Sequence, residues 1–178
     1  MSLTLYLVYV LLIIIENVSI SQNSVYFYKI NEKETIISFI DWNKNIALDI
    51  TEIDNQHKQL VEIINTLFDA MKEARGLEVI GDLLNQLANY AEYHFSTEEK
   101  YFEQFGYTES ELHKEEHKFL LEQVTDFKTS HDAGKIKRVS SESPITVEVW
   151  NLLKEWLIKH IQVEDKKYVT LFKERGLT

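Results

Sequence analysis

The chain has 178 residues, of which 44% are hydrophobic and 27% charged, and its formal net charge at pH 7 is −10. This length suits one domain with a core of ordinary size. The absence of cysteine excludes disulfides, iron–sulfur clusters and thiolate metal sites, so any bound metal is held by nitrogen and oxygen atoms. The negative charge and the lack of a basic cluster argue against binding to nucleic acid or to an anionic membrane surface.

The first residues form an apolar segment whose role stays open. Residues 3–15 read LTLYLVYVLLIII, which is shorter than the roughly 20 residues that span a bilayer but suits the apolar core of a secretion signal. No basic residue precedes this run, which argues against a signal peptide. We expect a cytoplasmic protein, with export through residues 1–21, a retained membrane anchor and a misassigned start as alternatives. Residues 22–40 show no helical period, so we divide the chain into an apolar leader with a linker, 1–38, and a folded domain, 39–178.

After the linker, apolar residues recur every three or four positions, which predicts amphipathic helices. The first helix is expected to begin at Thr51, because Thr51 and Asp54 have the spacing of a capping box, and to stop at Gly76. His57 lies on its apolar stripe. The second helix is expected over residues 78–105.

Short turns separate the next elements. Gly106 is suited to end the second helix, and Thr108 with Glu111 forms another capping-box pattern ahead of a third helix at about residues 109–130. The helical period predicts that one side of this third helix carries a cluster of five residues: Leu112, His113, Glu116, His117 and Leu120.

A polar connection over residues 134–143 precedes the last helix, for which Ser143 is the expected N-cap and Pro144 lies in the first turn. The apolar period of that helix continues as far as His160. Four amphipathic helices with short links predict an all-α fold, an antiparallel up-down-up-down four-helix bundle.

Five of the six histidines fall on these periodic apolar segments, beside carboxylates, and only His131 lies in a polar, loop-like setting. A single histidine on an apolar face is more often a core residue than a metal ligand. Burying five imidazoles and two carboxylates without partners, however, would cost several kcal/mol for each group. The set therefore predicts a metal site in the core of the bundle, held by His57, His94, Glu98, His113, His117, His160 and Asp165.

Seven candidate ligands exceed the four of a tetrahedral zinc site, and an imidazole-rich set suits iron, copper, nickel or zinc. Two ions bridged by Glu98 and Asp165 use the full set, and five histidines then divide as three and two, which leaves one ion with an open position. His160 and Asp165 lie five residues apart, which on a regular α-helix places them roughly 140° apart. We therefore predict a π-type turn between them.

Four motifs occur in order along the chain: Ile53-Asp54-x-Gln56-His57-x-x-Leu60, His94-x-x-x-Glu98, His113-x-x-x-His117 and Trp156-Leu157-x-x-His160-Ile161-x-x-x-Asp165. Together they resemble one family, the hemerythrins, and specifically the single-domain bacteriohemerythrins. The resemblance covers the chain from about Phe39 to its end, and it departs in a longer connection between His117 and His160 and in the N-terminal extension.

The resemblance implies a centre of two iron ions that binds dioxygen reversibly, as in an oxygen carrier or store, and implies that the protein is not an enzyme. One iron would be held by the residues matching His113, His117 and His160. The other, with the open position for dioxygen, would be held by those matching His57 and His94. Glu98 and Asp165 match the carboxylates that bridge the two ions, with an oxo or hydroxo group as the third bridge.

Other functions use the same ligands and stay open: an oxygen or nitric oxide sensor, or a module for iron storage or delivery that acts through a partner. A ferritin-like oxidase is disfavoured, because no histidine here follows a glutamate by three residues. Reversible binding also needs a dry pocket. We expect an apolar lid over the open position from four residues close to the ligands in sequence: Leu60, Phe95, Trp156 and Leu157.

Overall fold

The computed structural model describes residues 27–29, 36–73, 75–134 and 145–178. The sequence predictions for residues 1–26 and for the start of the last helix at Ser143 lie outside this part of the chain. The described elements are β1 (Phe27–Lys29), β2 (Ile36–Ser38), α2 (Thr51–Lys72), α3 (Gly76–Phe105), α4 (Ser110–Asp132), α5 (Ile145–Lys159), the π-helix η2 (His160–Asp165) and α6 (Lys166–Glu174).

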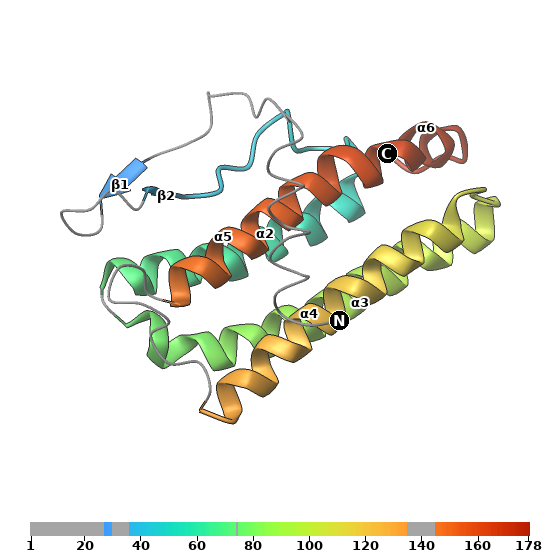
Figure 1. Cartoon of the computed structure of the whole chain (residues 1–178). Helices are drawn as coiled ribbons and strands as arrows, with labels where there is room; N and C mark the ends of the chain where they lie inside the picture. Colours follow the sequence, from blue (N-terminus) through green and yellow to red (C-terminus); the bar gives the residue numbers. More distant parts are fainter. Residues whose placement is uncertain (1–26, 30–35, 74, 135–144) are drawn as a thin grey trace.

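The folded part is an antiparallel four-helix bundle, as the sequence predicts. In Figure 1, α2 lies beside α5, and α3 lies beside α4. The helix α3 joins these two pairs because it also packs against α2. The fourth helical path runs through α5, η2 and α6 without leaving the bundle. Within the described ranges, no helix is both long enough and apolar enough to cross a bilayer.

A short antiparallel pair of strands precedes the bundle, with Phe27 opposite Ser38 and Lys29 opposite Ile36. Sequence analysis treats this region as a linker without regular structure. The two runs are only three residues long, which is too short for an alternating pattern to be recognised.

The first helix begins at Thr51, as predicted, but not through the predicted cap. Ile50 occupies the N-cap position, and no side chain caps this end. The Asp54 carboxylate accepts hydrogen bonds from the backbone amides of Leu48 at 2.8 Å and Asp49 at 3.0 Å. The predicted capping box is therefore wrong, because Asp54 stabilises the turn before the helix.

The predicted stop at Gly76 is also wrong. The helix α2 ends at Lys72, and Gly76 is the first residue of α3. At the other end of α3, Gly106 adopts φ = 72° and ends the helix in the left-handed conformation, as expected for glycine. The second capping box is absent, because Glu109 is the N-cap of α4 and no side chain caps that end.

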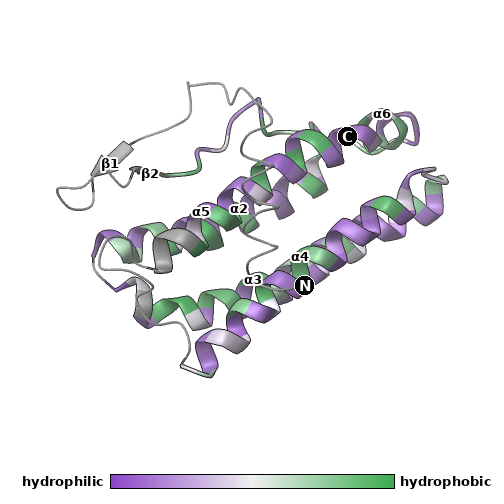
Figure 2. Ribbon diagram, in the orientation of Figure 1, coloured by the Kyte–Doolittle hydropathy of each residue, from purple (hydrophilic) through white to green (hydrophobic). Residues whose placement is uncertain are grey.

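The apolar stripes of the helices face one another and form the core, as Figure 2 shows by hydropathy. Two residues of the cluster predicted on α4 lie outside the core: Leu112 is 67% exposed, and the Glu116 side chain is half exposed. His131 lies in the last turn of α4 and not in a loop. Because α4 covers the bundle along a narrow stripe, only His113, His117, Leu120 and Val124 are buried on it.

The segment before α2 is fixed to the bundle by hydrogen bonds. The Asn65 side chain bonds both the amide nitrogen of Ile40, at 3.0 Å, and its carbonyl oxygen, at 2.9 Å. The amide of Thr51 donates to the carbonyl of Thr178 at 3.1 Å, which ties the start of α2 to the end of the chain. The first contact joins the preceding segment to α2, and the second joins the start of α2, where His57 lies, to the end of the chain.

Candidate metal centre

The helical path is widened into a π-helix between His160 and Asp165, as the five-residue spacing predicts. In a π-helix the hydrogen bond joins residue i and residue i+5, so the side chain five positions along the chain returns close to the face of the first. Both side chains are almost fully buried, and His160 Nε2 lies 3.1 Å from Asp165 Oδ1. The irregularity therefore turns Asp165 into the bundle beside His160.

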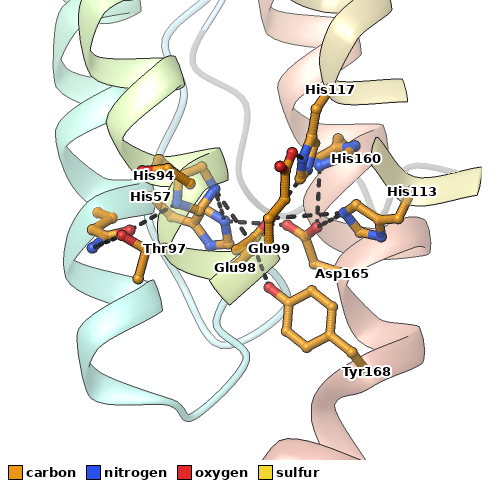
Figure 3. Close-up of polar contacts among 12 residues, drawn as sticks. His57, His94, Thr97, Glu98, Glu99, His113, His117, His160, Asp165 and Tyr168 are labelled. Atoms are coloured by element: carbon orange, nitrogen blue, oxygen red, sulfur yellow. Dashed lines mark hydrogen bonds and ion pairs between the residues drawn. The ribbon is translucent and has the colours of Figure 1, made fainter. Parts of the chain in front are cut away.

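All seven residues predicted as ligands meet at one place in the core, as Figure 3 shows. Each side chain is no more than 3% exposed. One comes from α2, two from α3, two from α4 and two from η2: His57; His94 and Glu98; His113 and His117; His160 and Asp165.

The seven residues form two overlapping groups that share the Glu98 carboxylate. The ligand atoms of each group lie within 4.8 Å of one another. Glu98 Oε2 faces the first group, 3.1 Å from His117 Nε2, and Glu98 Oε1 faces the second, 3.6 Å from His94 Nε2. The first group is Glu98, His113, His117 and His160, and the second is His57, His94, Glu98 and Asp165.

Asp165 also reaches both groups. Its Oδ1 lies 3.1 Å from His160 Nε2 and 3.3 Å from His113 Nε2. Its Oδ2 lies 3.1 Å from His57 Nε2. The two carboxylates thus stand between a side with three imidazoles and a side with two.

The unsatisfied atoms of the cluster fit metal ions. Most buried side-chain nitrogen and oxygen atoms that lack a hydrogen-bond partner within the described residues belong to this cluster, including both nitrogens of His113 and His160 and both oxygens of Asp165. Several of these atoms lie about 3 Å apart without hydrogen-bond geometry. Ligand atoms bonded to one ion at about 2.1 Å and at right angles are also about 3 Å apart. The donor set and its spacing are therefore those of a metal site.

Burial and neighbouring charges shift the pKa values of two clustered histidines in opposite directions. Burial lowers the pKa of His94 to about 3, which keeps that ring neutral and able to coordinate. Burial also acts to lower the pKa of His113, but the neighbouring carboxylates of Asp165, at 3.3 Å, and Glu98, at 3.7 Å, raise it to about 9. Without an ion, a proton on His113 offsets part of the charge of the two buried carboxylates.

Three polar side chains that sequence analysis did not assign hold the cluster from outside. Tyr168 donates its hydroxyl proton to Glu98 Oε1, and burial raises its pKa, so it remains a donor. Gln56 Oε1 lies 2.9 Å from His94 Nδ1, and Glu99 Oε1 lies 2.9 Å from His117 Nδ1. Two of these residues could have been noticed from the sequence, because Gln56 immediately precedes His57 and Glu99 immediately follows Glu98.

Apolar side chains surround the imidazoles. The Phe95 ring stacks on His117 with centroids 3.8 Å apart and planes 6° apart, and Trp156 stacks on His160 at 4.7 Å and 17°. Leu60 and Leu157 are also buried. Of the four residues expected to form a lid, Phe95 and Trp156 thus contact the imidazoles, and the lid role of Leu60 and Leu157 stays a prediction. The Trp42 ring, whose centroid lies 6.3 Å from that of His57, is an aromatic neighbour that the prediction did not include.

Comparison with known proteins places this geometry in a family. A family model described as "Hemerythrin HHE cation binding domain" matches residues 48–172. The bacteriohemerythrin of Pseudomonas paraeruginosa is 33% identical over 128 residues, covering 72% of this chain and 78% of that protein. The bacteriohemerythrin of Clostridium acetobutylicum is 30% identical over 132 residues, covering 72% of this chain and 97% of that protein. A crystal structure of wild-type hemerythrin superposes with a TM-score of 0.64 at 26% identity, covering 74% of this chain and 96% of that one.

Proposed function

Since this chain belongs to the hemerythrin family, we propose that it binds dioxygen reversibly at two iron ions held in the centre of the bundle. The observation that carries the proposal is the pair of overlapping ligand groups around Glu98. It supplies two adjacent positions for metal, with three imidazoles at one and two at the other. A single ion would leave part of this buried donor set unsatisfied.

In this proposal, each side of the cluster has a defined role. The three-histidine ion is held by His113, His117 and His160, and the two-histidine ion by His57 and His94. Glu98 and Asp165 would be shared by the two ions, which agrees with their short distances to imidazoles of both sides. The side with fewer imidazoles would leave a position open to dioxygen.

Bound iron would supply the electrons for reversible dioxygen binding. The protein orients the ligand side chains and excludes water from them. Tyr168 fixes the Glu98 carboxylate through its hydroxyl. The Gln56 side chain orients the His94 ring and donates in turn to Thr97 Oγ1 at 3.3 Å. Buried Leu60, Phe95 and Leu157 keep water away from the imidazoles. The proposal includes no chemical conversion of a substrate, so the protein acts as a carrier or store and not as an enzyme.

The test combines iron analysis with visible spectroscopy on the full chain. We expect two iron ions per chain, one for each ligand group, and an absorption band that appears when oxygen is added to the reduced protein and fades when oxygen is removed. Oxidation that oxygen removal does not reverse would favour a sensor or an iron store. One ion per chain, or none, would contradict the assignment of the site.

A further inference from the structure

Two of the five clustered histidines have a hydrogen-bonded partner on their outward nitrogen, and these partners differ in charge. Within the described residues, His117 Nδ1 bonds the Glu99 carboxylate, whereas His94 Nδ1 bonds the side-chain amide of Gln56, both at 2.9 Å. Because an ionised carboxylate only accepts hydrogen bonds, His117 donates from Nδ1 and presents Nε2 to the centre. The two partners come from different helices, Gln56 from α2 and Glu99 from α3, and Figure 3 shows Glu99 beside the cluster.

Stacking alone does not decide which nitrogen of His117 faces inward. Phe95 lies parallel to the ring, with planes 6° apart, and so fixes the plane. A flip of 180° about the Cβ–Cγ bond would return the ring to the same plane and keep the stack, but it would place Cε1, not Nε2, opposite Glu98. The hydrogen bond to Glu99 selects the orientation in which His117 Nε2 lies 3.1 Å from Glu98 Oε2.

Glu99 also connects the buried cluster with solvent. Its side chain is 33% exposed, while that of His117 is 2% exposed. Both residues line a surface groove of about 480 Å³ on α3 and α4, together with Lys114 and Lys118. The carboxylate therefore stays hydrated at the groove while its oxygen bonds the buried ring, which lowers the cost of placing a negative charge beside the core.

From this arrangement we propose that Glu99 is a positioning residue that makes the three-histidine half of the centre the more electron-rich half. A carboxylate that accepts from an imidazole N–H strengthens the donor character of the opposite nitrogen. The neutral Gln56 amide gives the two-histidine half no comparable charge. The inference rests on the proposed iron pair and adds a difference in electron density between its two ions.

Two substitutions separate charge from orientation. Glu99→Gln keeps an oxygen that accepts from His117 but removes the charge, so we expect iron to remain bound and the reduction potential to shift upward. Glu99→Ala removes the acceptor as well, and we expect iron affinity to fall by about 10–100-fold, as for other residues that orient metal ligands from outside. Glu103→Gln is the matched control, because Glu103 is exposed on the same helix and only pairs with Lys114 at 3.4 Å.

The measurements are the reduction potential from spectroelectrochemistry and the equilibrium release of iron to a competing chelator, both on the full chain. If the unsubstituted protein binds two iron ions but Glu99→Gln keeps the potential of Glu103→Gln, the inference is overturned, whatever Glu99→Ala does. If the unsubstituted protein binds no iron, the proposed function itself fails. An upward shift in Glu99→Gln alone supports the inference.

Discussion

Individual residues around the centre divide into those that hold the imidazoles and those that exclude water. Gln56 Oε1 and Glu99 Oε1 accept hydrogen bonds from His94 and His117, and the rings of Phe95 and Trp156 stack on His117 and His160. These contacts fix the orientation of the imidazoles. Leu157 has an apolar side chain that is 2% exposed, and it lies three residues before His160 in the sequence. We therefore expect Leu157 to exclude water from the cluster.

Leu157→Ala tests that contribution. Removing a buried leucine side chain leaves space for water, so we expect the oxygenated protein to oxidise irreversibly several times faster, with iron content unchanged. The decay of the oxygen-dependent absorption band measures this rate.

Leu153→Ala controls for general loosening of the bundle. Leu153 is 5% exposed on the same helix, and it lines a small apolar cavity with Leu67 and Leu84, not the histidine cluster. Both variants should lose about 2–5 kcal/mol of stability in denaturant unfolding. Equal oxidation rates in the two variants would remove Leu157 from the lid.

At the scale of single elements, the π-helix is the irregular feature that completes the site. It contains one residue more than a regular helix needs to return Asp165 to the face of His160, because four residues already turn about 400° on an α-helix. Val163 is 38% exposed within it. The surplus residue can therefore be removed on the solvent side.

Deleting Val163 should convert the segment to regular α-helix and leave His160, Asp165 and Tyr168 on their present faces. We expect such a variant to retain helical content by circular dichroism and to retain its iron. Deleting Glu155, in the regular part of α5, should instead rotate the neighbouring residues by about 100°. Loss of iron from the Val163 deletion together with retention in the Glu155 deletion would contradict this account.

The sequence predicts the π-helix and the start of α2 at Thr51, but not how the helix starts are capped, and the reason is physical. The spacing of His160 and Asp165 conflicts with a regular helix, so the chain has to deform if both side chains face inward. Thr51 and Thr108 fit a local pattern, but tertiary contacts override it. The Asp54 carboxylate accepts hydrogen bonds from the amides of Leu48 and Asp49 instead of capping its helix. The local sequence does not indicate which of these two interactions forms.

In the candidate site, the sequence likewise predicts the proposed ligands but not the residues that hydrogen-bond to them from outside. The seven proposed ligands could be chosen because histidine and carboxylate spacing follows the helical period, and the structure brings them together, although metal binding stays a prediction. Glu99 and Tyr168 could not be assigned, because an acidic residue or a tyrosine near a ligand is common on helices. Only the packed bundle shows that Tyr168 reaches Glu98 from a separate helix.

For the whole molecule, the metal-free cluster predicts a maximum of stability near pH 6.5. Burial lowers the pKa of His94 from 6.5 to about 3, so between these values the unfolded chain binds a proton that the folded chain does not. Stability should then fall as the pH drops below about 6.5. For His113, burial is outweighed by Asp165 and Glu98, which raise the pKa to about 9, so stability should also fall as the pH rises from 6.5 to 9.

Urea unfolding of the chelator-treated protein between pH 4 and pH 9 measures both slopes. Iron loading should abolish the slope above pH 6.5, because a coordinating His113 has already lost its proton. Stability that rises steadily to pH 9 in the metal-free protein would show that His113 carries no extra proton in the folded state.

The contact between His57 and Asp165, at 3.1 Å, joins the first helix of the bundle to its last helical segment. An ion bound by both residues would close a loop that contains nearly the whole domain. The entropy cost of closing a loop rises with its length, so this contact is among the most costly to form from the unfolded chain. Such a closure forms only after every intervening helix has docked, so it belongs to a late step of folding. Iron should therefore act mainly on the lifetime of the folded state, slowing unfolding far more than it speeds folding.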